Sequence, residues 1–209
     1  MGTALGGLIG LVRSQARPSP GETCRSSRLH SVSITKEDNR IGIRRSPNSV
    51  GTGKAMGVIL SFTKVTSERL SHLIAAGPQA QEELWQLERA DDDPSGYLDK
   101  AWDGLRYLLE EAETGVDLCD SGVPLDSEEY YGWPADLVGS TAERLRDTPF
   151  TALAAHYDPA AMDAANVYPG IWTRDGDAAL GYLRIHYATL AAFFADAAKS
   201  GSAAVMHFG

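Results

Sequence analysis

Two aspartates four positions apart are the residues of this chain best suited to acid–base chemistry. Asp99 and Asp103 lie in the stretch 98–112, LDKAWDGLRYLLEEA, and Arg106 follows three positions after the second aspartate. On a helix, this spacing places both carboxylates on one face. In a cleft, such a pair can act as general acid and general base, whereas on an exposed face it forms a solvated ion cluster with Arg106. The sequence leaves both interpretations open.

The element that positions these aspartates is predicted to be an amphipathic helix over 98–112. Its apolar residues recur at helical spacing, and its charged residues occupy the other face. Trp102 lies near the middle of the apolar face. Because a buried indole dominates the packing around it, we expect Trp102 to lie inside the domain and the fold to be organised around this helix.

Other catalytic and metal-binding signatures are missing from the sequence. No His-Glu-x-x-His, Cys-x-x-Cys or Gly-x-Ser-x-Gly pattern occurs, and His186 lies on the apolar stripe of a predicted helix, where a packed histidine is expected. The segment 51–54, GTGK, lacks two defining positions of a phosphate loop. The sequence therefore predicts no metal, no cofactor and no assigned catalytic residue, and whether the protein is an enzyme stays open.

The charge of the chain is divided between two segments of opposite sign. Residues 1–55 hold nine Lys and Arg against three acids, a net charge of +6, whereas residues 56–209 hold ten against 25, a net charge of −15. A body this acidic repels phosphate backbones, so we expect no nucleic-acid partner. Its surface suits a basic protein partner, although acidity also serves solubility alone.

Two features of the sequence predict a cytoplasmic protein. No run of 18 apolar residues occurs, so we expect no membrane partner. Cys24 and Cys119 are the only cysteines, and they lie in segments of very different composition. We therefore expect no disulfide framework and a reducing compartment.

Composition also divides the chain into an N-terminal extension over 1–55 and a single domain over 56–209. The extension is rich in Arg, Ser, Gly and Pro and has no aromatic residue, so it cannot offset the entropy of ordering. We expect it to be disordered or not native to the protein. Its composition resembles a transit peptide, but apolar patterning begins only at Met56, which favours a natural start there.

Residues 56–209 are predicted to form an α+β domain. Alternating apolar residues predict strands over 57–65 and 203–208, which we expect to pair in a small sheet with helices packed on one face. Helical spacing, caps and Gly or Pro stops predict these further helices: 67–76, 79–89, 136–147, 148–157, 158–167 and 176–200. In the second of them, Trp85 is expected to face inward.

The segment 114–134 is predicted to be a loop, because Gly and Pro residues interrupt it throughout. It combines acids with Tyr130, Tyr131 and Trp133. A loop of this length is often functional, and this one could cover a pocket. Alternatively, its aromatic residues pack onto the core for ordinary hydrophobic reasons.

Three short motifs follow one another along the domain. They are Met56-Gly before a strand, Leu98-Asp-Lys-x-Trp102 before a Leu-Leu pair, and a Tyr-Pro-Gly turn at 168–170. In this order they resemble the YfbM-like family of uncharacterised bacterial proteins (domain of unknown function 1877). The resemblance covers 56–209 and implies a single α+β domain of that type, without implying an activity.

The resemblance also marks candidate ligand-binding positions. Residues that match recurring family positions are Asp99, Lys100, Trp102, Tyr168, Pro169 and Trp172. Asp103 departs from the pattern, because the family often has His there, so any role of an imidazole is missing from this chain. The candidate ligand-binding set is Asp99, Lys100, Trp102, Asp103, Tyr168 and Trp172.

Two classes of function are compatible with these residues. The first is a non-enzymatic binding or interaction protein, regulatory or immunity-type, whose acidic surface binds a basic protein or whose aromatic loop binds a small molecule. The second is a hydrolase-like enzyme using Asp99 or Asp103 near Tyr168 and Trp172. Convergence of these side chains on one concave pocket would favour a ligand or a substrate, and their dispersal into core and surface would favour a protein partner.

Overall fold

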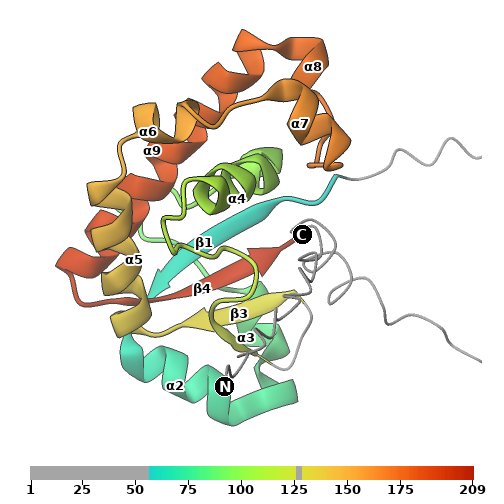
Figure 1. Ribbon diagram of the computed structural model, residues 1–209. Coiled ribbons are helices and arrows are strands. Elements are labelled where there is room, and N and C mark those ends of the chain that lie inside the picture. Colours follow the sequence, from blue (N-terminus) through green and yellow to red (C-terminus); the bar gives the residue numbers. More distant parts are fainter. Residues whose placement is uncertain (1–56, 126–128) are drawn as a thin grey trace, which may run out of the picture.

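An antiparallel sheet forms the centre of the computed structural model, which describes residues 57–125 and 129–209. Its strands, in the spatial order β1-β4-β3-β2, are β1 (Leu60–Val65), β4 (Ala203–Phe208), β3 (Tyr130–Trp133) and β2 (Val123–Pro124). The predicted pairing of the first and last strands is confirmed (Figure 1). The expectations for 1–55 and for a start at Met56 lie outside the described residues.

Both faces of the sheet are buried. Successive side chains of a strand point to opposite sides, so each strand contributes residues to both faces. In β4, Ala204 and Met206 join the main core, whereas Ala203 and Val205 join a second apolar cluster. Phe62 of β1 lies opposite Met206 and joins the main core as well. The continuous apolar run of β4 is typical of a strand with two buried faces.

The main core lies between the sheet and three helices, α4 (Trp102–Glu111), α5 (Ala135–Asp147) and α9 (Asp177–Lys199) (Figure 1). At its centre, the rings of Phe62, Trp133 and Phe194 have centroids 5.1 to 5.4 Å apart. Such aromatic pairs contribute about 0.5–1.5 kcal/mol each beyond the burial of their area. Trp102 is only 9% exposed and belongs to the same core, which confirms its predicted burial.

Helices also cover the other face of the sheet, which corrects the expectation that they pack on one face only. The covering elements are α2 (Ser67–Ala76), the 3₁₀ turn η1 (Gly77–Ala80) and α3 (Gln81–Trp85) (Figure 1). Leu70, Leu73 and Leu84 of these elements pack in one cluster with Ala203 and Val205 of β4. The second face of β4 is apolar too, and an apolar sheet face must be covered.

Two local predictions are wrong for identifiable reasons. Trp85 is 62% exposed rather than inward, and the helix predicted over 79–89 ends at this residue. The preceding turn η1 is a 3₁₀ helix, which turns more per residue than an α-helix, so a face predicted from α-helical spacing is rotated. The predicted loop over 114–134 contains β2 and β3, because β3 pairs with the distant β4.

The remaining helical segments of the described residues are short: η2 (Asp99–Ala101), α6 (Phe150–Ala154), α7 (Pro159–Ala164) and α8 (Trp172–Asp175). Within the described part of the chain, no helix has both the length and the apolar character needed to cross a membrane. Cys119 is buried, and the expectation of no disulfide also concerns Cys24, which lies outside the described residues.

Candidate functional site

Asp99 lies in the 3₁₀ turn η2, immediately before α4, in a backbone conformation that is uncommon for a residue with a side chain. Its φ is +48°. One carboxylate oxygen accepts a hydrogen bond from the Tyr182 hydroxyl at 3.0 Å, and the other accepts one from the Tyr97 hydroxyl at 3.4 Å. Strained residues of this kind cluster at functional sites, and the two hydroxyls hold the carboxylate in place.

Lys100 follows in the same turn and directs its side chain to the start of the domain. Its backbone N–H donates to the Tyr182 hydroxyl at 3.1 Å. The space beside Gly57 is filled by the end of the Lys100 side chain and by the Tyr168 hydroxyl, since a Cβ built on this glycine would lie under 3.0 Å from both. Among the described residues, Lys100 is the only half-buried cationic side chain that makes no ion pair.

Trp102 and Tyr168 form the apolar floor beside Lys100. The Trp102 indole N–H donates to the Val58 carbonyl at 3.1 Å, and its ring lies 6.2 Å from that of Tyr168. Burial, with a smaller effect of the Asp99 charge, raises the pKa of Tyr168, while a hydrogen bond from the Val58 backbone lowers it. Burial and the Asp99 carboxylate also raise the pKa of Tyr182. Both tyrosines are therefore protonated at neutral pH and can donate hydrogen bonds.

Asp103 is a buried structural residue. It is 7% exposed, and one carboxylate oxygen accepts from Arg106 Nε at 2.7 Å while the other accepts from the Tyr168 backbone N–H at 2.7 Å. Arg106 in turn pairs with Glu110 at 3.0 Å. Asp103 thus ties α4 to the turn before α8, and its partners differ from those of Asp99.

Trp172 lies in the core and is fully buried. Its indole N–H donates to the Val167 carbonyl at 2.7 Å, and its ring packs against α4 at Gly104, which has no side chain. The structure therefore brings Asp99, Lys100, Trp102 and Tyr168 together and leaves Trp172 apart from them.

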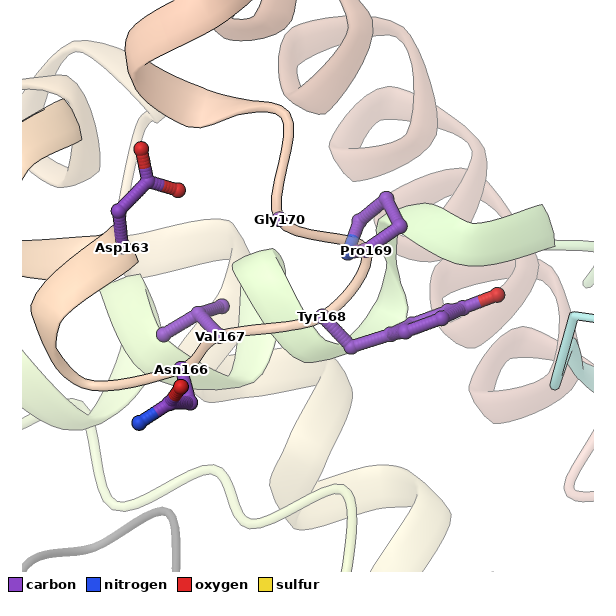
Figure 2. A pocket seen from close by; sticks show the side chains of 6 residues that line it. All are labelled: Asp163, Asn166, Val167, Tyr168, Pro169 and Gly170. Carbon is purple, nitrogen blue, oxygen red and sulfur yellow. The ribbon is translucent and has the colours of Figure 1, made fainter.

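A separate hollow of about 330 Å³ lies on the turn between α7 and α8 (Figure 2). It is lined by Asp163, Asn166, Val167, Tyr168, Pro169 and Gly170. The Tyr168 ring points away from Asp163 and Asn166, so the hollow borders mainly the backbone of the turn (Figure 2). Hydrogen bonding from the Thr173 side chain, and from the Thr173 backbone N–H at 2.9 Å, lowers the pKa of the Asp163 carboxylate. Tyr168 is the one predicted site residue in this lining.

The residues that complete the site were not recognised in the sequence. Tyr182 carries no motif and is far along the chain from Asp99, and Tyr97 carries no motif although it is close to Asp99 in the sequence. Gly57 belongs to the Met56-Gly motif, but nothing local indicates that it lies beside Lys100 and Tyr168. The described residues contain no group of three or more His, Cys, Asp or Glu placed to hold a metal ion. The arrangement offers donors and aromatic surface, together with one carboxylate that already accepts two hydrogen bonds.

A family model described as "Domain of unknown function (DUF1877)" matches residues 56–207. The crystal structure of a protein of unknown function, YfbM from Escherichia coli, is similar at 16% sequence identity with a TM-score of 0.55, covering 72% of this chain and 99% of that one. No curated protein matches the chain. The structural similarity concerns the fold.

Proposed function

The chain belongs to the family described as domain of unknown function (DUF1877), and we propose that it is a non-enzymatic binding protein with an acidic surface. The recognition surface is the one formed by Asp99, Lys100, Trp102 and Tyr168. The observation that carries the proposal is Lys100. In a domain with 25 acids and ten bases, this half-buried ammonium has no carboxylate partner among the described residues. An ammonium group without a carboxylate partner is suited to binding a ligand.

The hydrolase-like alternative has less support. A carboxylate that acts as general acid or base must reach the substrate. Asp103 is buried, and both of its oxygens accept hydrogen bonds from Arg106 and from the Tyr168 backbone. Asp99 contacts two tyrosine hydroxyls instead. The two carboxylates therefore have different neighbours and do not form a catalytic pair.

The acidic surface supports a protein as the partner. Trp85 is 62% exposed at the end of α3, and Glu82 and Glu83 precede it in the same helix. Tryptophan is enriched among the residues that dominate binding at protein interfaces. An exposed indole among carboxylates suits a partner that is basic and partly apolar. A cytoplasmic location and the absence of a nucleic-acid partner stay predictions from the sequence.

A thermal-shift screen against a metabolite library tests the proposed surface. We expect a ligand that raises the melting temperature of the wild type and has no such effect on Lys100→Met. The matched control is Lys199→Met, because Lys199 is exposed at the far end of α9 and should leave the shift unchanged. Trp172 is unsuitable as a test position, since its substitution disturbs the core.

The same variants separate binding from catalysis. A hydrolysis activity on ester, amide or phosphoester substrates that Asp99→Asn abolishes would overturn the proposal in favour of the enzyme. A ligand that stabilises the wild type and Lys100→Met equally would show that binding takes place elsewhere.

A further inference from the structure

We propose that Lys100 and Tyr168 form a binding site for a monovalent organic carboxylate beside Gly57. This inference rests on the proposed binding function and names the chemical class of the ligand. It depends on three observations: two hydrogen-bond donors that meet at one point, a glycine that leaves room for them, and the charge around them.

The two donors reach the same place from different elements. Lys100 comes from η2, and Tyr168 comes from the turn before α8, yet both side chains end beside Gly57. Burial raises the pKa of the Tyr168 hydroxyl, so this group keeps its proton at neutral pH and can donate it. Within the described residues, neither the ammonium nor this hydroxyl donates to a protein acceptor. A carboxylate has two oxygens and can accept from both donors at once.

Gly57 lets the two donors come together. A Cβ at this position would lie under 3.0 Å from the Tyr168 hydroxyl and from both Cε and Nζ of Lys100. No real Cβ atom is that close to such atoms, so any larger residue would displace one or both donors. Glycine at position 57 is therefore part of the site.

The surrounding charge favours a singly charged ligand. Lys100 is a single cation at this point of a domain with a net charge of −15. The nearby Asp99 carboxylate adds negative charge and contributes to raising the pKa of Tyr168. A second negative charge on the ligand would be repelled, which disfavours phosphate groups. Val58, which follows Gly57, is 43% exposed, and Tyr97, which contacts Asp99, is 46% exposed; both offer apolar surface to the organic part of the ligand.

Titration of the ¹⁵N-labelled full chain with butyrate, monitored by NMR, tests the site. Butyramide has the same size without the charge, and inorganic phosphate is a multiply charged anion. We expect butyrate to shift the amides of Gly57, Val58 and Lys100 in a saturable manner, while butyramide and phosphate have at least about tenfold weaker effects, because hydrogen bonds to charged groups are the stronger ones.

Three variants locate the effect. Lys100→Met and Tyr168→Phe each remove one donor, and we expect each to weaken butyrate binding, the first by about tenfold or more. Gly57→Ala should do the same by displacing both donors. Lys199→Met, the matched control, should bind butyrate as the wild type does. Melting curves of every variant identify any that fail to fold, and Lys100→Arg, which keeps the charge, should retain binding.

Two results would overturn the inference. Equal shifts by butyrate and butyramide would show that the negative charge is not recognised, and wild-type affinity in Lys100→Met would show that the lysine does not bind it. If the metabolite screen meanwhile gives a Lys100-dependent ligand that is not a carboxylate, only the ligand class is wrong. If no Lys100-dependent ligand appears in either experiment, the proposed recognition surface fails as well.

Discussion

At the scale of single residues, two aspartates four positions apart have opposite roles. Asp99 is half-buried and accepts hydrogen bonds from two tyrosine hydroxyls, while Asp103 is buried and neutralised by Arg106. The difference follows from where η2 ends and α4 begins, which turns the first carboxylate toward α9 and the second toward the turn before α8. The contacts of Asp103 with Arg106 and with the Tyr168 backbone are therefore expected to contribute to stability.

Removal of the Asp103 carboxylate should destabilise the domain strongly. In Asp103→Ala, the guanidinium of Arg106 stays buried and keeps only Glu110, and the Tyr168 N–H loses its acceptor. We expect the free energy of unfolding to fall by about 3 kcal/mol, as is typical when one partner of a buried ion pair is removed. Urea denaturation followed by circular dichroism measures this change.

The matched control is Asp147→Ala, because the pair between Asp147 and Arg146 is about 70% exposed on both sides. Exposed pairs contribute little, so this variant should differ from the wild type by less than about 0.5 kcal/mol. Equal effects of the two substitutions would contradict the structural role of Asp103.

At the scale of elements, the close approach of α4 to α8 and α9 depends on a glycine. A Cβ at Gly104 would lie under 3.0 Å from the Trp172 ring and 2.8 Å from a methyl group of Leu183. The glycine disfavours the helix itself, but it lets the fully buried Trp172 pack directly against the backbone of α4. Packing between helices therefore outweighs local helix propensity at this position.

Gly104→Ala should destabilise the domain although alanine is the better helix former. The added methyl group overpacks the contact with Trp172, at a cost of about 1–3 kcal/mol. Gly139→Ala in α5 is the control, since a Cβ there meets nothing within 4 Å, and it should stabilise the domain by about 0.5–1 kcal/mol. Chemical denaturation of both variants tests the opposite signs, and a stabilised Gly104→Ala would contradict this packing.

The pairing of β3 with β4 should make stability depend on pH. His207 lies opposite Tyr130 and stacks on its ring at 4.3 Å. Burial lowers the pKa of His207 below its ordinary value of 6.5, although the Glu129 charge acts in the other direction. The unfolded chain therefore binds a proton at His207 more readily than the folded protein does. The stability that depends on a neutral His207 is present above pH 6.5 and is lost as the pH falls through the pKa of the folded state.

The change His207→Phe removes this titration and keeps a ring that can stack on Tyr130. Unfolding free energies measured between pH 7.5 and about 5 should fall less steeply for this variant than for the wild type. Identical slopes for the two proteins would show that His207 does not contribute to the pH dependence.

At the scale of the whole molecule, the acidic excess sets the electrostatic balance. The domain over 56–209 has a net charge of −15, and several of its bases are already paired, such as Lys64 with Asp93 and Asp196. Most carboxylates therefore repel one another without compensation, which disfavours the compact state.

Screening by salt should therefore stabilise the protein. Raising NaCl from 10 to 150 mM shortens the range of the repulsion, and about 1 kcal/mol of relief would raise the melting temperature by roughly 2–4 °C in a domain of this size. Differential scanning calorimetry at neutral pH measures the shift. A melting temperature that falls with salt would mean that the ion pairs outweigh the repulsion.

The sequence by itself determined those features that depend on local periodicity. The alternation over 57–65 and 203–208, the amphipathic spacing around Trp102 and the cap at Asp158 correspond to β1, β4, α4 and α7. These signals are local, because a period of two or of 3.6 residues is written in neighbouring positions. The α+β class and the burial of Trp102 follow from them.

Only the tertiary structure decided which distant residues meet. Strand β3 forms within a segment rich in turn residues because β4 supplies its hydrogen bonds, and Trp172 enters the core while Tyr168, four residues earlier, reaches Gly57. The surface around Lys100 draws on η2, α9, the start of the domain and the turn before α8. Contacts across such separations arise from how the elements pack, and no local pattern of residues encodes them.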